Sequence, residues 1–205
     1  MYAHSNQAVR GIFICLEGLD GCGKSTQAKI LANWLKSLDK DVILTAEPTK
    51  GPIGRFLRKI IQGKVEVAPL AEAMLFAADR CDHLEKLVKP ALTKGKVVIC
   101  ERYIYSSLAY QGARGVPEQT IRKLNEQFLR PHLVILLDVP VDVALGRMKK
   151  RDLDEFEKNR KFQERVREIY LLLFKKEGLP ILDGTLSVSE LAEKIKRLVT
   201  PLLKE

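Results

Sequence analysis

A nine-residue segment near the N-terminus constrains the fold of this chain more than any other feature. It fits the pattern G-x-x-x-x-G-K-[ST] once, and it comprises Gly18, Leu19, Asp20, Gly21, Cys22, Gly23, Lys24, Ser25 and Thr26. An apolar run at residues 11–16 precedes it, and residues 25–38 follow with apolar side chains at helical spacing. This order of strand, glycine-rich turn and helix predicts a phosphate-binding loop.

The residue types of this loop suit the triphosphate of a nucleotide. Small residues at Gly18, Gly21 and Gly23 let the backbone N–H groups turn inward around a phosphate chain. Lys24 can reach the β- and γ-phosphates, and Ser25 can ligate Mg²⁺. We therefore expect the chain to bind a nucleoside triphosphate together with Mg²⁺.

Short apolar, β-branched runs alternate with helical patterns along the chain. The predicted strands cover residues 12–16, 42–45, 97–100, 133–138 and 180–182. The predicted helices cover residues 25–38, 53–62, 69–89, 117–128 and 189–203, with a charged pair across 141–176. This alternation predicts an α/β fold, in which a five-stranded parallel sheet is flanked by helices and ligands lie at the carboxyl ends of the strands. No linker or repeat interrupts it, so we expect one domain over residues 1–205.

The formal net charge of +9 raises the question of a nucleic-acid partner. A basic surface attracts polynucleotides, but it attracts nucleotide phosphates equally well. The densest basic stretch, residues 147–167, also contains five acidic residues, an alternation typical of an exposed helical segment. No aromatic-interleaved RNA-binding signature is present. We therefore expect no nucleic-acid partner.

Composition also bears on location. No apolar run approaches the roughly 18–20 residues that span a bilayer, and the polar N-terminus lacks a signal-peptide pattern. The four cysteines are scattered without metal-ligand spacing, and the three histidines form no cluster in the sequence. We expect a cytoplasmic protein with free thiols, no membrane partner and no histidine metal site.

Charged side chains follow two of the predicted strands at their carboxyl ends. Glu101 and Arg102 follow the third strand, where the acid could hold Mg²⁺ and the arginine could face a second phosphate. Glu47 follows the second strand, and Arg58 lies on the next helix. Because the carboxyl ends of parallel strands share one edge of the sheet, we expect these groups near the phosphate loop.

A further pair lies on the helix predicted at residues 69–89. Phe76 and Arg80 are four residues apart and therefore share one helix face. An aromatic ring beside a guanidinium suits a base and its 5′-phosphate. Each residue also has a purely structural alternative, with Phe76 in the core and Arg80 paired with Asp79 or Glu72.

Several longer motifs together resemble the thymidylate kinase family. They are the loop at 18–26, Glu47-Pro-Thr, Leu-Phe-Ala-Ala-Asp-Arg at 75–80, the segment 101–112 with Tyr110-Gln111-Gly112, and Leu-Leu-Asp-Val at 136–139. The resemblance extends from about residue 12 to the final helix. It implies a nucleoside-monophosphate-kinase fold of the P-loop class, usually a homodimer. The implied reaction transfers the γ-phosphoryl group of ATP to dTMP, which yields dTDP for dTTP synthesis.

The resemblance also implies roles for individual residues around dTMP. Phe76 stacks on thymine, while Arg80 and Gln111 contact the base. Arg102 and Arg58 hold the phosphate. The remaining residues implied in dTMP binding are Glu47, Asp20, which accepts from the sugar 3′-OH, and Tyr110, which crowds the 2′ position. The family also implies a cis peptide bond before Pro48.

Two positions depart from the family pattern. Glu101 stands where the family usually has aspartate, so its carboxylate lies one methylene further out. Gly21 stands where some members carry an arginine in the loop, so the cation for the transferring phosphate must come from elsewhere. The basic segment at about 147–160 resembles the lid that closes over ATP. We expect Arg147 over the adenine and Arg151, with Lys24 and Arg102, among the catalytic cations.

Three other functions stay open at this point. A kinase for another nucleotide or a nucleoside is the nearest, although Tyr110-Gln111-Gly112 favours dTMP. A GTPase is a second, but the Asn-Lys-x-Asp motif that reads guanine is absent. A catalytically silent nucleotide-binding protein is the third, and the presence of Lys24, Ser25 and Arg102 argues against it.

Overall fold

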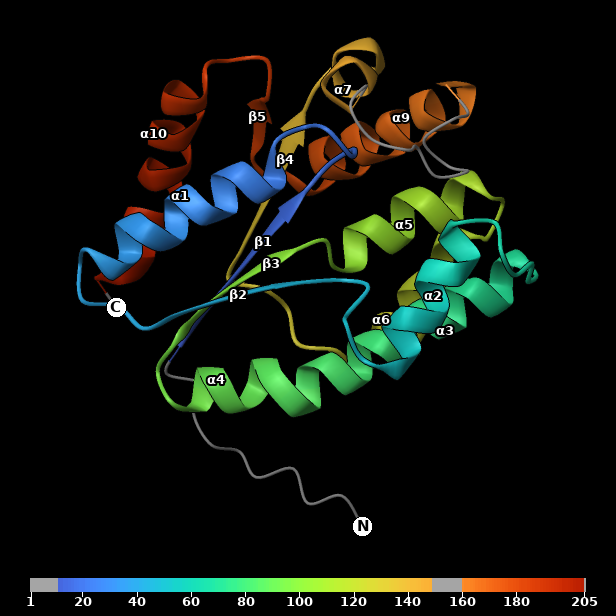
Figure 1. The fold of residues 1–205 in the computed structure, drawn as a ribbon, viewed down its shortest axis with the longest axis horizontal. Helices are drawn as coiled ribbons and strands as arrows, with labels where there is room; N and C mark the ends of the chain where they lie inside the picture. The colour runs from blue at the N-terminus through green and yellow to red at the C-terminus, as the bar shows by residue number, and fades with distance from the viewer. Residues whose placement is uncertain (1–10, 149–159, 205) are drawn as a thin grey trace.

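A five-stranded parallel sheet forms the centre of the molecule. The computed structural model describes residues 11–148 and 160–204. The strands lie in the order β2-β3-β1-β4-β5 (Figure 1). Their bounds are β1 Ile12–Glu17, β2 Val42–Ala46, β3 Val97–Glu101, β4 Leu133–Asp138 and β5 Ile181–Asp183. The α/β fold and the five strands predicted from the sequence are confirmed, with bounds that differ by one residue at most.

The central strand β1 is apolar because both of its faces are covered. Ile14 pairs in register with Ile99 of β3 and with Leu133 of β4. Every residue of β1 after Ile12 is buried, which is the pattern of a strand in a two-sided parallel sheet. The ring of Phe13 meets that of Tyr103 edge-on at 5.2 Å between centroids.

Helices cover both faces of this sheet (Figure 1). α1 (Lys24–Lys36) and α10 (Val188–Val199) pack together on one face. On the other face α4 (Lys89–Thr93) contacts β3, and α9 (Arg160–Glu177) contacts β4 and α5 (Ile104–Ala113). The other helices among the described residues are α2 (Pro52–Ile61), α3 (Pro69–His83), α6 (Glu118–Asn125) and α7 (Val141–Met148), with a 3₁₀ turn at Thr200–Leu203.

Two helical segments differ most from the prediction, while α6 ends three residues earlier than predicted and the last helix ends in a 3₁₀ turn. The helix expected at 69–89 runs on through a π-helical turn at Leu84–Val88 into α4. Helix α5 was not predicted, because it is buried on most sides and lacks an amphipathic period. Its N-cap Tyr103 contributes no side-chain cap hydrogen bond, so the sequence shows no start signal there.

The carboxyl ends of the strands point toward one edge of the sheet. β1 leads into the phosphate loop, β2 ends just before Glu47, and β3 ends at Glu101. The Glu47–Pro48 peptide bond is cis, as predicted. Within the residues described, no helix is long and apolar enough to cross a membrane.

Candidate active site

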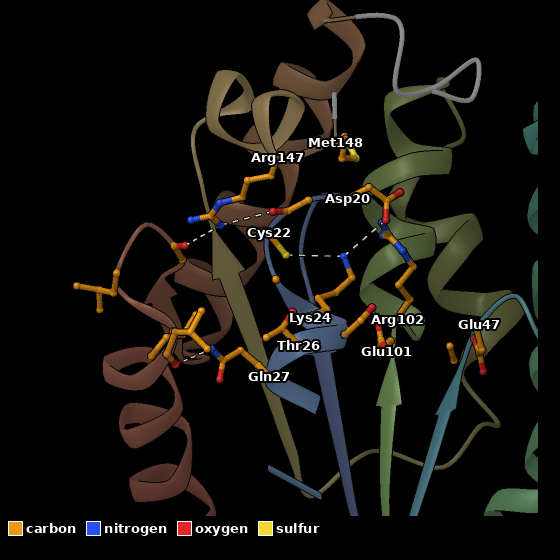
Figure 2. Close-up of a pocket in the computed structure, with 18 residues that line it drawn as sticks. Asp20, Cys22, Lys24, Thr26, Gln27, Glu47, Glu101, Arg102, Arg147 and Met148 are labelled. Carbon is orange, nitrogen blue, oxygen red and sulfur yellow. Dashed lines mark hydrogen bonds and ion pairs between the residues drawn. The ribbon is translucent and has the colours of Figure 1, made fainter. Parts of the chain in front are cut away.

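The phosphate loop joins β1 to α1 and wraps around the ammonium group of Lys24 (Figure 2). Lys24 Nζ donates to the carbonyl oxygens of Gly18 at 2.9 Å and Leu19 at 2.8 Å. Gly23 caps α1 in a left-handed conformation, with φ of 101°. The positive end of the helix and a nearly buried lysine thus meet at one point, which is an anion-binding arrangement.

Gly21 shows why this loop cannot carry an arginine. Its φ is +80°, and a Cβ atom there would lie 2.3 Å from the carbonyl oxygen of Ala144 on α7. Met148 of the same helix would lie 3.1 Å away. Because α7 packs directly over the loop, any side chain at residue 21 would force the two apart. An arginine at residue 21 is therefore excluded by the packing of α7 on the loop.

A cavity of about 590 Å³, here called the loop pocket, opens above the phosphate loop (Figure 2). Residues 20–26 line it, together with Glu47, Glu101 and Arg102 at the ends of β2 and β3 and Arg147 from α7. Arg147 Nη1 donates to the carbonyl oxygen of Gly184 at 3.0 Å. Gly184, Leu186, Val188 and Leu191, which the sequence did not indicate, line the pocket on the α10 side.

Ser25 and Glu101 form a pair of oxygen ligands in the loop pocket. Ser25 Oγ donates to Glu101 Oε2 at 2.6 Å. Hydroxyl and carboxylate oxygens are the ligands that Mg²⁺ prefers, and two neighbouring ligands on its octahedral shell lie about 3 Å apart. The pair therefore fits Mg²⁺ after a small shift. The extra methylene of glutamate keeps the carboxylate within reach of the serine.

A second, narrower cavity, here called the aromatic slot, lies beside the loop pocket. Its walls are Pro48 from the loop after β2, Ile61 from α2, Phe76 from α3, and Ser106, Ser107, Tyr110 and Gln111 from α5. Asp20 and Arg102 line both cavities. The two cavities therefore meet at a carboxylate and a guanidinium.

Arg102 is held firmly at this junction. Its Nη2 lies 2.9 Å from Asp20 Oδ1 and donates to Tyr110 Oη at 3.2 Å, and its guanidinium stacks on the Tyr110 ring at 4.9 Å. Burial lowers the pKa of Arg102, but the charge of Asp20, the neighbouring Tyr110 and Tyr170 and the hydrogen bond to Asp20 together outweigh this and raise the pKa well above its usual value. Arg102 is therefore a fixed cation between the cavities.

The comparisons with known proteins agree with this geometry. The family profile described as "Thymidylate kinase" matches residues 16–195. The chain belongs to the thymidylate kinase family. A "Probable thymidylate kinase" of Pyrococcus abyssi is 47% identical over 199 residues, which cover 93% of this chain and 97% of the relative.

Two further relatives support the same assignment. A "Probable thymidylate kinase" of Thermococcus gammatolerans is 51% identical and covers 80% of this chain and 83% of its own. A "Thymidylate kinase" of Symbiobacterium thermophilum is 39% identical and covers 94% of each. This thymidylate kinase family member is thus a nucleotide-binding phosphotransferase that phosphorylates dTMP.

Three residues that the family resemblance assigns to dTMP do not line the aromatic slot: Arg80, Glu47 and Arg58. Arg80 is fully buried, and its guanidinium donates to Glu47, Asn125, the Tyr103 carbonyl and Ser107. It reaches the aromatic slot only through Ser107. Its partner is Glu47 and neither of the acids considered from the sequence.

The third of these residues, Arg58 on α2, reaches back to the loop after β2. Its guanidinium donates to the carbonyl oxygens of Pro48 and Thr49. The same loop is held from α3 by Asp79, whose carboxylate accepts from the backbone N–H and hydroxyl of Thr49. Contacts of Arg58 with a phosphate and of Arg80 with a base stay predictions.

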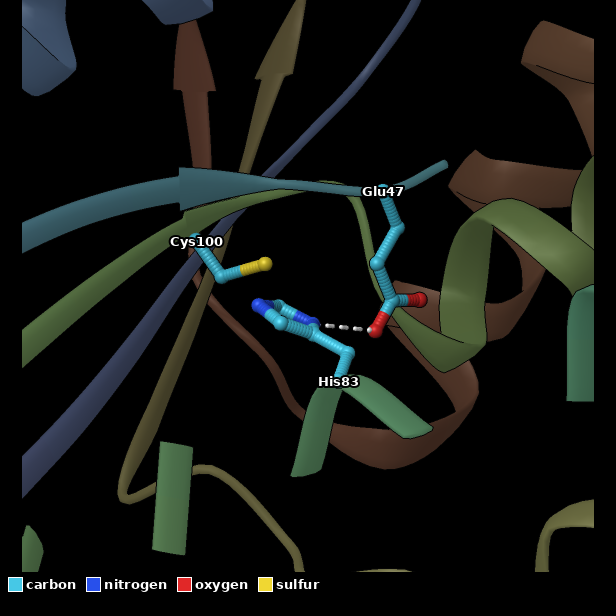
Figure 3. Close-up of side chains that lie close together, drawn as sticks. All are labelled: Glu47, His83 and Cys100. Carbon is cyan, nitrogen blue, oxygen red and sulfur yellow. Dashed lines mark hydrogen bonds and ion pairs between the residues drawn. The ribbon is translucent and has the colours of Figure 1, made fainter. Parts of the chain in front are cut away.

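Glu47 also belongs to a buried cluster with His83 and Cys100 (Figure 3). His83 Nδ1 lies 3.0 Å from Glu47 Oε1, and His83 Nε2 lies 2.7 Å from Thr45 Oγ1. Figure 3 shows the thiol and the carboxylate near different nitrogens of the ring. The two ring nitrogens pair with Glu47 and Thr45, and Glu47 also pairs with Arg80, so these side chains form a chain of hydrogen bonds.

Sequence reasoning missed Glu17, the buried last residue of β1. Its carboxylate accepts from the backbone N–H of Tyr103 at 2.8 Å, from Ser106 Oγ at 2.6 Å and from Tyr170 Oη at 3.0 Å. These bonds hold the sharp corner after β3, where Arg102 has a φ of 67°. The only sequence signal was an acid at the end of an otherwise apolar strand.

The proposed lid falls mainly outside the described residues. Arg147, on the last turn of α7, lies at the rim of the loop pocket. Arg151 and the rest of residues 149–159 are not described by the structure. Their roles stay predictions.

Proposed function

We propose that this protein transfers the γ-phosphoryl group of ATP to dTMP with Mg²⁺, with ATP in the loop pocket and dTMP in the aromatic slot. The observation that carries the proposal is the junction of the two cavities at Asp20 and Arg102. Two nucleotides bound there would meet at their phosphates. Phosphoryl transfer needs mainly alignment and charge stabilisation, which such a junction can supply.

On the ATP side, Lys24 leaves the loop carbonyls and contacts the β- and γ-phosphates. Backbone N–H groups of residues 18–26 surround the β-phosphate. Ser25 and Glu101 hold Mg²⁺, which neutralises phosphate charge when bound. Arg102 lies between the donor and acceptor phosphates and stabilises the charge that develops in the transition state. No general base is needed, because the dTMP phosphate oxygen is already an anion near neutral pH.

On the dTMP side, Phe76 stacks on thymine and Gln111 contacts the base edge, with Arg80 behind it. Tyr110 fills the space of a 2′-OH, and Asp20 accepts from the 3′-OH. Arg58 and Arg102 hold the phosphate, and Glu47 positions the guanidinium of Arg80. These assignments rest on the family resemblance together with the placement of Phe76, Tyr110 and Gln111 on the slot wall.

The segment at about 147–160 acts as a lid in this proposal. Arg147 covers the adenine, and Arg151 supplies the cation that Gly21 excludes from the loop. The position of Arg147 at the pocket rim and the packing of Ala144 over Gly21 support this arrangement. The whole chain, residues 1–205, forms one catalytic domain.

We further propose a homodimer in the cytoplasm. Phe56 on α2 and Leu70 and Met74 on α3 are large apolar side chains exposed at 39%, 42% and 49%. α2 and α3 pack side by side (Figure 1), so a second copy could cover both helices.

The experiment that tests the function is ADP release from ATP with a panel of acceptors: dTMP, dUMP, dGMP, AMP and thymidine. We expect dTMP to exceed dUMP by about 1–3 kcal/mol in transition-state binding, the usual contribution of one methyl group in an apolar pocket. The other acceptors should be poorer still. A preference for AMP or dGMP would assign the slot to another nucleotide kinase, and no ADP release with any acceptor would indicate a silent nucleotide-binding protein.

A further inference from the structure

Gln111 presents an unsatisfied hydrogen-bond acceptor at the wall of the aromatic slot. The side chain comes from α5 and is only 1% exposed. Its Nε2 donates to Glu72 Oε1 at 2.8 Å, while its Oε1 has no hydrogen-bond partner among the described residues. A buried carbonyl oxygen without a partner is costly, so a ligand that donates a hydrogen bond to it is favoured.

Glu72 determines which end of this amide faces the slot. It lies on α3 with no exposed surface, and its two oxygens accept from Gln111 and from Arg114. Burial raises the pKa of Glu72, and the hydrogen bond from Gln111 and the charge of Arg114 oppose that rise. The ion pair between Arg114 and Glu72 favours the ionised carboxylate, which only accepts hydrogen bonds. Gln111 therefore turns its NH₂ toward Glu72, which leaves its oxygen as the unpaired group of a side chain that lines the slot.

We propose that Glu72 is a positioning residue for base specificity, which fixes Gln111 so that the slot selects pyrimidines that carry a hydrogen on N3. The proposal rests on the proposed function, in which the slot holds the acceptor base. Thymine and uracil present N3–H as a donor. Cytosine presents a lone pair at N3, which would face the Gln111 oxygen and leave two buried acceptors unpaired.

The carboxylate is needed because an amide alone would not discriminate. A free glutamine can rotate its terminal amide and offer either a donor or an acceptor at little cost. In this protein rotation would point the Gln111 oxygen at the Glu72 carboxylate, which can offer it no hydrogen. Discrimination at N3 is therefore controlled from outside the slot, by a residue absent from its lining.

The substitution Glu72→Gln should invert this preference without a change of volume. Arg114 is a donor only, so it holds the oxygen of the new side chain. The new NH₂ group then faces Gln111, which must turn its own oxygen toward it. The NH₂ of Gln111 would then point into the slot, where it suits the lone pair of cytosine and opposes N3–H.

The experiment measures kcat/KM and calorimetric affinity for dTMP, dUMP and dCMP in the wild type and in Glu72→Gln. We expect the ratio of dTMP to dCMP to fall on the order of 10²-fold. The ratio of dTMP to dUMP should not change, because both bases carry N3–H. Glu177→Gln is the matched control, because Glu177 also pairs with an arginine, Arg122, but lies on α9 away from both the slot and the loop pocket. It should leave both ratios unchanged.

Two outcomes separate this inference from the proposed function. If the wild type releases no ADP with dTMP, the proposed function fails. If the wild type prefers dTMP and folded Glu72→Gln keeps the wild-type ratio of dTMP to dCMP, the role of Glu72 is wrong. Should Glu72→Gln not fold, Gln111→Met gives the second test: its ratio of dTMP to dCMP should fall without inverting, and an unchanged ratio overturns the proposal.

Discussion

The loop pocket and the aromatic slot meet at Asp20 and Arg102, yet they are built in different ways. The loop pocket takes most of its polar groups from consecutive residues, 20–26, and from the backbone around Lys24. The aromatic slot collects side chains from α3, α5 and the loop after β2, which lie far apart in the sequence. Behind the slot lie buried charged networks, around Arg80 and around Glu72.

Because of this difference, mutations at the two cavities should affect different properties of the protein. In the loop pocket a side chain can be removed while the backbone that shapes the site remains. Behind the slot, each polar group is a partner of another buried group, so its removal leaves a charge unpaired in the interior. Substitutions at the first cavity should therefore reduce activity, and those behind the second should reduce stability.

The largest effect should come from Lys24→Ala. If Lys24 bridges the β- and γ-phosphates, its loss should lower kcat/KM on the order of 10³-fold or more, with little change in the free energy of unfolding. Steady-state ADP release and urea unfolding measure the two quantities. Lys36→Ala, an exposed lysine in the last turn of the same helix, is the control. If the Lys24→Ala enzyme kept a tenth of the wild-type turnover, the phosphate loop would have no essential role in catalysis.

Arg151→Ala should have the next largest effect, and it should lower the rate of phosphoryl transfer without weakening substrate binding. A cation that arrives with a lid acts mainly in the transition state, so kcat should fall on the order of 10²–10⁴-fold. The affinity for dTMP, measured by calorimetry, should stay near the wild-type value. Lys161→Ala, at an exposed position of α9, should be almost silent. An unchanged kcat in Arg151→Ala would assign the catalytic cation to another residue.

Arg80→Met tests the buried side of the comparison. Removal of the guanidinium leaves Glu47 without its positive partner, which should lower the free energy of unfolding by about 3–5 kcal/mol. Arg122→Met is the control, since Arg122 is partly exposed and pairs with Glu118 and Glu177 at the surface. Its loss should cost about 1 kcal/mol or less. If urea unfolding gave the same loss of unfolding free energy for both variants, burial of the ion pair would not determine the cost of breaking it.

Tyr110 should control sugar discrimination with a smaller effect. Tyr110→Leu opens space beside the sugar, so the preference for dUMP over UMP should fall about tenfold, in the range of one small group in a pocket. Tyr110→Phe keeps the ring and loses only the oxygen that accepts from Arg102. The phenylalanine variant should retain the preference in kcat/KM. If both variants lose it equally, the hydroxyl and not the ring excludes the 2′-OH.

The smallest effect concerns α10, whose first turn borders the loop pocket through Val188 and Leu191. Ser187 and Glu190 cap this helix in a reciprocal capping box. Ser187→Ala should therefore lower the free energy of unfolding by about 1 kcal/mol. The KM for ATP should rise slightly, and the ratio of dTMP to dUMP should not move. Ser189→Ala, at the second residue of the helix, is the control, and a shift in the acceptor ratio would contradict the separation of the cavities.

The sequence was most informative where a function depends on consecutive residues. The loop at 18–26 was predicted with its strand and helix, because glycine, lysine and serine at fixed spacing have few other uses. The five strands were predicted because buried parallel strands are short apolar runs. Helix α5, which carries Tyr110 and Gln111, was missed because a helix buried on most sides has no polar face to reveal its period.

What only the tertiary structure decided was the partner of each buried polar group. Arg80 could have paired with Asp79 or Glu72 by sequence spacing, but it pairs with Glu47, thirty-three positions away. Glu72 instead holds Gln111 and Arg114, and Asp79 holds Thr49. Sequence spacing determines neighbours only within one helix or strand. Partners across the sheet edge depend on how α3, α5 and the loop after β2 pack, because the cost of an unpaired buried charge is settled by three-dimensional proximity.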